Sequence, residues 1–314
     1  MKLSRLWSRT PSRTSTMLAG RPRSQPGRKG LAIVAIMRNE VRHVGDWLRF
    51  HSLAGVHDFF LYDDGSTDGT PDVARSIDGL NVTVIPWKLT ASLRSPDVFF
   101  SRQVLAYCHA IENFGGAFRW MAFIDIDEYI VPKRGNKILQ VLAGLDQFSN
   151  VSLPWTMYGP NRHQVFPDLP APYAYTARAA RREGPLLNFK CIVDPTDVTE
   201  VRVHRFRTIS MGKESVNDRG YMAHYKLRHQ STFISDAALQ LNHYYTRSYE
   251  ELKLKLSKGA VSDSPIEQRS EKVWEKLKLL EEKSIEDRCA IAFLERIGIF
   301  SPDQLRGVGN RNSR

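Results

Sequence analysis

Two aspartates separated by one residue have the clearest chemical meaning in this sequence. Asp125 and Asp127 follow an apolar run, Trp120–Ile124, which has the length of a buried strand. Because side chains alternate along a strand, we expect both carboxylates to emerge on one face. Adjacent carboxylates repel each other, and a divalent cation such as Mg²⁺ or Mn²⁺ relieves that repulsion and can hold a diphosphate. The spacing therefore predicts a metal site; an ordinary acidic loop is the alternative, because Asp-x-Asp is a common tripeptide.

The first half of the chain alternates predicted strands with predicted helices. The strands are Leu31–Met37, Asp58–Tyr62, Val82–Ile85 and Trp120–Ile124. The helices between them begin at Asn39, which we expect to act as an N-cap, at Thr70 before Pro71, and at Ser101. This alternation predicts an α/β fold with a mixed, mainly parallel sheet flanked by helices.

Polar clusters follow three of these strands. Arg38–Glu40 and the pair Asp63 and Asp64 stand at strand ends, as Asp125 and Asp127 do. Ligands of such sheets bind outside the carboxyl ends of the strands, so we expect the three clusters to form one site. Neither a Gly-x-Gly-x-x-Gly pattern after the first strand nor a Walker A motif is present, which argues against a dinucleotide-binding Rossmann fold and a P-loop.

The second half is less regular. Residues 160–185 have the composition of a long surface loop, of the kind that forms lids. Ser248 and Glu251 form a capping box that opens a short helix. The other predicted elements are a helix over Lys137–Leu145, strands over Val151–Trp155, Asn188–Val193, Val201–His204 and Leu239–Tyr245, and a C-terminal helical segment that starts at Ser264.

The positive charge lies at the two ends. Eight Lys and Arg in residues 1–30 and three Arg in residues 306–314, with no acid in either segment, account for the net charge of +11. We therefore divide the chain into a disordered basic tail (1–30), a main domain (31–260), a helical segment (261–305) and a second basic tail (306–314). Solvated tails are the simpler interpretation; contact with an anionic membrane is the alternative. The neutral central part disfavours nucleic-acid binding.

Other compositional features suggest a compartment. The three cysteines are far apart, residues 1–30 lack the apolar segment of a secretory signal, and no apolar run reaches the roughly 20 residues of a membrane span. We expect a cytoplasmic protein, peripheral at the inner membrane face if the tails bind lipid.

Five motifs in a fixed order resemble inverting glycosyltransferases of the GT-A fold. The resemblance is closest to the family-2-like group and the related family 92, and it covers about residues 31 to 260. The motifs are Ile36–Glu40, Tyr62–Asp68, Phe123–Tyr129, Asn188–Lys190 and Leu241–Tyr244. Tyr129 stands where such proteins more often have Phe.

The resemblance implies a role for several residues. Asp125 and Asp127 would hold Mn²⁺ or Mg²⁺ and the diphosphate of a nucleotide-sugar donor, most simply a UDP-sugar. His243 or His204 would complete the metal site, with His243 preferred for its place in the Asn-His-Tyr motif and a structural role as the alternative for each. Around the nucleotide the resemblance places Arg38, Asn39, Glu40, Asp63 or Asp64, Arg102 and Gln103.

The implied reaction needs a carboxylate base. A hydroxyl of a glycan or glycolipid acceptor would attack the anomeric carbon, and a carboxylate would take its proton. Glu128 adjoins the metal motif but alternates to the other side of the strand; Asp168 lies in the loop after Trp155. Both are candidates.

Three other functions compete with this one. A catalytically inactive sugar- or nucleotide-binding protein of the same fold would not need the intact Asp125 and Asp127. A haloacid-type phosphatase would need x-Thr or x-Val after the second aspartate, where Glu128 and Tyr129 stand. A nucleotidyltransferase would need a Gly-rich loop where Arg38–Glu40 stands.

Overall fold

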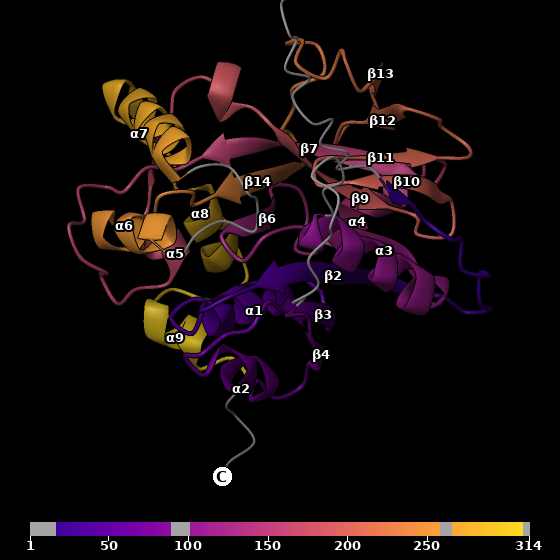
Figure 1. The fold of residues 1–314 in the computed structure, drawn as a ribbon, viewed down its shortest axis with the longest axis horizontal. Helices are drawn as coiled ribbons and strands as arrows, with labels where there is room; N and C mark the ends of the chain where they lie inside the picture. The colour runs from indigo at the N-terminus through magenta and orange to yellow at the C-terminus, as the bar shows by residue number, and fades with distance from the viewer. Residues whose placement is uncertain (1–16, 89–100, 258–265, 310–314) are drawn as a thin grey trace, which may run out of the picture.

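One ten-stranded sheet organises the molecule (Figure 1). The computed structural model describes residues 17–88, 101–257 and 266–309. The strand order is β13-β12-β7-β9-β5-β2-β3-β4, and β14 pairs with both β6 and β7. Strands β5, β2, β3 and β4 are parallel to one another, whereas β9 is antiparallel to β5 and β7. The strands are β2 (Lys29–Met37), β3 (Asp58–Asp63), β4 (Asn81–Pro86), β5 (Phe118–Phe123), β6 (Glu128–Pro132), β7 (Asn150–Met157), β9 (Phe189–Val193), β12 (Glu214–Val216), β13 (Met222–His224) and β14 (Leu239–His243).

Helices cover both faces of this sheet, which explains why β2 is apolar from Leu31 to Met37. Ile33 and Ala35 belong to the core cluster that contains Trp47 of α1. Ala32 and Val34 belong to a second cluster with Tyr107 of α3. Strands buried on both faces are expected to be continuously apolar. The helices are α1 (Val44–Leu53), α2 (Thr70–Arg75), α3 (Arg102–Phe114), α4 (Ile138–Leu142), α5 (Ala171–Ala174), α6 (Tyr249–Ser257), α7 (Ile266–Glu282), α8 (Cys289–Arg296) and α9 (Pro302–Arg306), with 3-10 turns η1 (Gly115–Ala117), η2 (Ala143–Leu145) and η3 (Gly184–Leu186). The predicted mixed, mainly parallel α/β fold is confirmed.

Two smaller sheets flank the large one. β1 (Met17–Leu18), β10 (Val198–Arg202) and β11 (Arg205–Thr208) form one, and β8 (Ala177–Ala179) pairs with β15 (Ser284–Glu286) in the other. The predicted strand Val201–His204 was wrong at its end, because Val203 and His204 form the turn between β10 and β11. The apolar alternation continues through this turn, so the pattern alone could not show it.

The helix predicted from Asn39 begins later, at Val44. Asn39 has a left-handed backbone conformation, with φ of 54°. Asn tolerates this region better than most residues. Its Oδ1 accepts a hydrogen bond from the backbone N of Thr67 (2.8 Å), so the side chain fixes the neighbouring turn and does not cap a helix. Residues 38–43 consequently form a loop at the end of β2.

The C-terminal segment is part of the same core. Phe293 and Leu294 of α8 and Leu305 of α9 are fully buried in the cluster that contains Trp47. Phe293 packs edge-on against Phe50 of α1, with ring centroids 5.4 Å apart. Within residues 17–88, 101–257 and 266–309, no helix combines the length and the hydropathy that crossing a membrane requires.

Candidate active site

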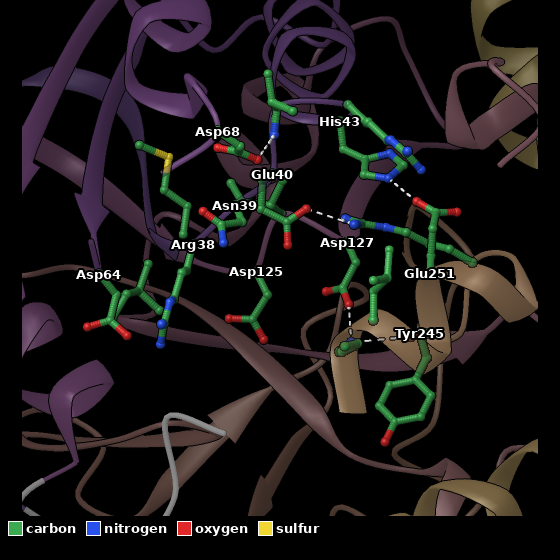
Figure 2. Close-up of a pocket in the computed structure, with 18 of the residues that line it drawn as sticks. Arg38, Asn39, Glu40, His43, Asp64, Asp68, Asp125, Asp127, Tyr245 and Glu251 are labelled. Atoms are coloured by element: carbon green, nitrogen blue, oxygen red, sulfur yellow. Dashed lines mark hydrogen bonds and ion pairs between the residues drawn. The ribbon is translucent and has the colours of Figure 1, made fainter. Parts of the chain in front are cut away.

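A cavity of about 530 Å³ lies at the carboxyl ends of β2, β3 and β5, as expected for such a sheet (Figure 2). Three segments supply most of its lining: residues 36–43 at the end of β2 and in the loop after it, Asp125–Asp127 after β5, and residues from 245 to 255 before and within α6. Asp64, Asp68 and Gln103 complete it. The structure thus brings together Arg38, Asn39, Glu40, Asp64, Gln103, Asp125 and Asp127 of the predicted residues.

A tight turn, and not a strand, presents the two aspartates. β5 ends at Phe123, and Asp125 and Asp127 lie in the turn before β6. The backbone N of Glu128 donates to the Asp125 carbonyl oxygen (3.0 Å), which closes this turn. The expectation that strand alternation aligns the aspartates was wrong, although both carboxylates do line one cavity.

Asp125 is held from two sides. Its Oδ1 accepts a hydrogen bond from Gln103 Nε2 of α3 (2.7 Å), and its Oδ2 accepts one from Lys190 Nζ of β9 (2.9 Å). Lys190 is 1% exposed, and its Nζ also lies 3.7 Å from Glu128 Oε2. Burial opposes a charge on Lys190, but Asp125 and Glu128 outweigh burial and raise its pKa well above the ordinary value. Lys190 is therefore a fixed positive charge beneath Asp125.

Glu128 lies behind the turn and does not line the cavity. Its Oε1 accepts from Trp155 Nε1 (2.6 Å) and its Oε2 accepts from the backbone N of Asp125 (2.8 Å). Burial raises the pKa of this carboxyl well above its usual range, with Lys190 acting against that shift. One oxygen bonds the turn and the other bonds Trp155 of β7, so in this arrangement Glu128 ties the Asp125 loop to β7.

Asp127 faces two nitrogen groups. Its Oδ2 accepts from Lys255 Nζ of α6 (2.8 Å), and its Oδ1 lies 3.5 Å from His243 Nε2. Burial favours the neutral carboxyl, but Lys255 and His243 outweigh burial and lower the pKa of Asp127 well below its usual range. Burial lowers the pKa of His243, although Asp127 acts in the opposite direction. A carboxylate thus faces a neutral imidazole, whose buried Nδ1 has no hydrogen-bond partner within the described chain.

These donors fit a metal ion only together with a substrate. Among residues 17–88, 101–257 and 266–309, no three His, Cys, Asp or Glu side chains form a group that could hold a metal by themselves. Asp127 and His243 offer oxygen and nitrogen donors of the kind that Mn²⁺ accepts. In nucleotide sites such an ion binds one or two carboxylates and takes further ligands from the phosphates.

The second histidine predicted as a ligand has another environment. Neither histidine is among the residues that line the cavity, but His243 contacts Asp127, whereas His204 Nδ1 lies 3.0 Å from the Phe189 carbonyl oxygen. Burial, and then the charge of Lys190, lowers the pKa of His204 to about 3. Its ring packs edge-on against Trp155, with centroids 5.2 Å apart.

Arg247 supplies a buried charge opposite the aspartates. One guanidinium nitrogen of Arg247 lies 2.7 Å from Glu40 Oε2, which Figure 2 marks with a dashed line. Burial opposes the charge of Arg247, but Glu40 and Asp127 outweigh burial and raise its pKa. Like Asn39, Arg247 has a left-handed backbone, with φ of 51°. Such strain is typical of residues that a functional site holds in place.

A hydrogen bond between His43 and Glu251 also joins the loop after β2 to α6. Burial lowers the pKa of His43 and leaves its ring neutral at pH 7. His43 Nε2 bonds Glu251 Oε1, and the Tyr175 hydroxyl donates to Glu251 Oε2 (3.0 Å). Burial opposes ionisation of Glu251, yet His43 and Arg247 outweigh it and lower its pKa to about 2. This pair and the Arg247–Glu40 pair fix the far wall of the cavity.

The predicted nucleotide-binding aspartates differ from each other. Asp64 is buried, and its Oδ1 accepts from a guanidinium nitrogen of Arg102 (2.7 Å). Burial raises the pKa of Asp64, with Arg102 acting against that shift. Asp64 Oδ2 has no hydrogen-bond partner among the described residues. Asp63 does not line the cavity; its carboxylate accepts from the backbone N of Ser66 (3.1 Å) and shapes the turn.

Asp168 lies elsewhere. Its side chain is 80% exposed, and it pairs with Arg306 of α9 at 3.1 Å. It is not among the residues that line the cavity. A catalytic role for Asp168 or Glu128 stays a prediction, and it requires the side chain to move.

Sequence reasoning missed three cations of the site: Lys190, Arg247 and Lys255. Lys190 stood inside a motif that carried the resemblance but received no role. Lys255 follows the capping residue Glu251 by four positions, so both project from one face of α6, and this spacing was an available signal. Nothing in the spacing marked Arg247, because its pairing with Glu40 joins residues 207 positions apart.

Comparison with known proteins gives the same family over most of the chain. The model of glycosyltransferase family 92 matches residues 34–278, which extends into α7 beyond the expected end at 260. A family 92 protein of Oryza sativa subsp. japonica is 27% identical over 237 residues, which cover 72% of this chain and 35% of that protein. A family 92 protein of Arabidopsis thaliana is 23% identical over 243 residues, 72% of this chain and 36% of that protein. The chain therefore spans about a third of the length of these curated relatives.

Solved structures show only a remote likeness. The bifunctional glycosyltransferase WbbM, in its apo form, is 13% identical, with a TM-score of 0.30 over 43% of this chain and 25% of that one. The mannosyltransferase Ktr4p of S. cerevisiae is 13% identical, with a TM-score of 0.28 over 47% of this chain and 46% of that one. At these scores the likeness supports no argument about function. The extended match of the family model is decisive, and it shows that this chain belongs to glycosyltransferase family 92.

Proposed function

We propose that this protein is a glycosyltransferase that takes its sugar from a UDP-sugar bound in the cavity and transfers it, with inversion, to a hydroxyl of a glycan or glycolipid. The observation that carries this proposal is the pairing of an ionised carboxylate, Asp127, with the cations Lys255 and Arg247 in one cavity. A metal–diphosphate complex carries positive charge on the metal and negative charge on the phosphates. The carboxylate of the lining complements the metal, and the cations complement the phosphates. A cytoplasmic location goes with this proposal, because the three cysteines are free, as expected in a reducing compartment.

The chain's own groups have separable tasks in this proposal. Asp127 and His243 hold Mn²⁺ or Mg²⁺, while Lys190 and Gln103 fix Asp125 beside them. The bound metal neutralises charge on the leaving diphosphate as a Lewis acid. Lys255 adds positive charge on the same side, and Arg247 keeps Glu40 in position. The unpartnered Asp64 Oδ2 accepts a hydrogen bond from the nucleoside.

The test compares UDP binding with and without Mn²⁺ by calorimetry. In Asp127→Asn the side chain keeps its size but loses the negative charge, and we expect at least a tenfold loss of Mn²⁺-dependent affinity. Asp72→Asn is the matched control, because Asp72 is 86% exposed on α2 and lies outside the cavity. Equal binding of UDP by Asp127→Asn and the parent, with Mn²⁺ in both, would place the donor elsewhere. If the parent protein binds UDP but hydrolyses no UDP-sugar, the result favours the alternative of a catalytically inactive nucleotide-binding protein.

A further inference from the structure

A second, smaller recess concentrates positive charge on the other side of the molecule from α6. It has a volume of about 170 Å³ and is lined by the hairpin β10–β11 together with Lys213 and Tyr225. In the view of Figure 1, β10 to β13 lie on the right and α6 lies on the left. Its lining shares no residue with the cavity that contains Asp125 and Asp127.

The cations of this recess outnumber its acids. Arg202, Arg205, Arg207 and Lys213 line it, and Glu200 is the single carboxylate in its described lining. Arg207 already binds Glu200, with 2.7 Å between a guanidinium nitrogen and Oε1. Arg202, Arg205 and Lys213 thus remain without a matching acid among the residues that line the recess. Like charges held together cost stability, and an anion would relieve that cost.

The guanidinium groups are also positioned in advance. The guanidinium of Arg205 lies over the Tyr225 ring, 4.1 Å from its centroid, which restricts the side chain. Arg202 and Arg205 are paired positions of the β10–β11 hairpin, and burial, and then the charge of Arg205, lowers the pKa of Arg202. Planar guanidinium groups donate hydrogen bonds in pairs to phosphate oxygens. A phosphate group therefore matches this recess better than a lone halide does.

Exposed apolar side chains close in sequence to the recess lining point to a lipid as the source of the phosphate. Leu227, two residues after Tyr225, is 47% exposed, and Ile209, two residues after Arg207, is 53% exposed. Exposed apolar groups beside cations are the composition of surfaces that sit in a lipid headgroup layer. The basic N-terminal sequence joins here, because Met17 of β1 pairs with Val201 of β10. Residues 1–16, which carry Lys2, Arg5, Arg9 and Arg13, precede this pairing directly.

We propose that the recess formed by Arg202, Arg205, Arg207 and Lys213 binds the phosphate of anionic phospholipids and docks the protein on a negatively charged membrane. Each cation near such a surface adds to the attraction, and the attraction is screened by salt. This proposal does not depend on the donor or the acceptor of the sugar transfer. It assigns the membrane contact to a folded recess, with the basic tail as an addition.

The test is co-sedimentation of the full chain with vesicles at about 0.1 M salt, where surface charges still act over roughly 10 Å. Vesicles of phosphatidylcholine with phosphatidylglycerol are compared with vesicles of phosphatidylcholine alone. The recess variant combines Arg202→Gln, Arg205→Gln and Lys213→Gln. The control variant combines Arg75→Gln, Lys278→Gln and Arg288→Gln, which removes the same charge from exposed positions on α2 and α7 and before α8.

We expect the parent to bind only the anionic vesicles, the recess variant to bind at least tenfold more weakly, and the control variant to change less than threefold. Leu227→Ser alone should weaken binding severalfold, because it removes an apolar contact and no charge. An unchanged melting temperature and unchanged UDP binding show that the recess variant is folded. If the recess variant does not fold, the single variant Lys213→Gln, at an exposed position, replaces it. We then expect severalfold weaker vesicle binding, and unchanged binding would overturn the proposal.

Three results would overturn the proposal. Equal losses in the recess and control variants would mean that net charge alone attracts the protein. Undiminished binding of the recess variant would assign the contact to the tail. Binding of inorganic phosphate in the recess, without binding of the parent to anionic vesicles, would make the recess a site for a small free anion.

Discussion

The two lysines that contact the aspartates of the turn, one buried and one half-exposed, contribute differently to the free energy of unfolding. Lys190 is 1% exposed and lies between Asp125 and Glu128, whereas Lys255 is 42% exposed and contacts Asp127. Removing one member of a buried ion pair leaves an uncompensated charge and costs about 3–5 kcal/mol. We expect Lys190→Met to lower the free energy of unfolding by about that amount, and Lys255→Met by less than about 1 kcal/mol. Urea unfolding at pH 7 measures both, and equal losses would contradict a buried role for Lys190.

The buried imidazole of His51 makes stability depend on pH. His51 Nδ1 lies 2.9 Å from the Trp47 carbonyl oxygen, and the backbone N of Ile130 donates to its Nε2 (3.2 Å), so the ring is neutral when folded. Burial lowers its pKa from 6.5 to about 3, with the bond to Trp47 acting against that shift. Below pH 6.5 the unfolded chain therefore binds a proton that the folded chain does not. His51 contributes a stability loss as pH falls from about 6.5 to about 3.

This effect amounts to about 2 kcal/mol between pH 7 and pH 5. We expect His51→Gln to be less stable than the parent at pH 7 but to lose about 2 kcal/mol less between the two pH values. His57→Gln, at an exposed position, should retain the parent's slope. Equal slopes for all three proteins would show that His51 is protonated in the folded state.

At the scale of single elements, α6 has the most concentrated role in the site. Its N-terminus is a capping box, in which Ser248 Oγ donates to Glu251 Oε2 (2.8 Å) and accepts from the backbone N of Glu251 (3.2 Å). The same helix presents Lys255 to Asp127. Losing such a cap costs about 1 kcal/mol. We therefore expect Ser248→Ala to lower the melting temperature and to weaken Mn²⁺-dependent UDP binding as well.

Ser257→Ala, at the exposed C-terminal end of α6, is the control and should leave both properties nearly unchanged. Calorimetry and a melting curve on the two variants give the comparison. Loss of stability in Ser248→Ala without loss of UDP affinity would mean that α6 does not hold the donor.

Local patterns predicted the elements well and their ends less well. The run Leu31–Met37 could be read as a strand because helices bury both faces of β2, and the capping box at Ser248 is confirmed. The late start of α1 could not be predicted from the sequence, because Asn39 suits an N-cap and a left-handed turn equally. Only the contact of its side chain with Thr67 shows that it forms the turn. The prediction that strand alternation aligns Asp125 and Asp127 failed for a similar reason, since an apolar run does not show where a strand ends.

At the scale of the whole molecule, the family match ends before the core does. The model of the family stops at residue 278, yet Phe293, Leu294 and Leu305 are buried beside Trp47 and Phe50. Deleting a large buried Phe or Leu side chain costs about 2–5 kcal/mol, so the loss of all three is comparable with the whole stability of an ordinary domain, about 5–15 kcal/mol. We expect a chain that ends at Glu282 to lack a cooperative melting transition, and a chain that ends at Gly309 to melt as the parent does. A cooperative transition in the shorter chain would show that α8 and α9 are accessory.

The motifs predicted which residues gather at the cavity better than they predicted roles. Arg38–Glu40, Asp64, Asp125 and Asp127 meet because parallel strands bring their carboxyl ends to one edge, which the strand pattern alone implies. The pairings of Arg247 with Glu40 and of Lys255 with Asp127 join the sheet to α6 across long stretches of chain. Such contacts depend on the whole fold, and no local pattern encodes them.

The long separation of the residues that wall the cavity has a consequence for the protein during its synthesis. Glu40 and Arg247 are 207 residues apart, and His43 and Glu251 are 208 apart. A nascent chain that has emerged as far as residue 240 contains both aspartates of the turn but none of Arg247, Glu251 and Lys255. It therefore presents Asp127 without Lys255, the cation that pairs with it, although Lys190 is already present to pair with Asp125. If the cavity binds a UDP-sugar as proposed, we expect binding to begin only when α6 has left the ribosome, so that a prematurely terminated chain would not bind the donor in a half-built site.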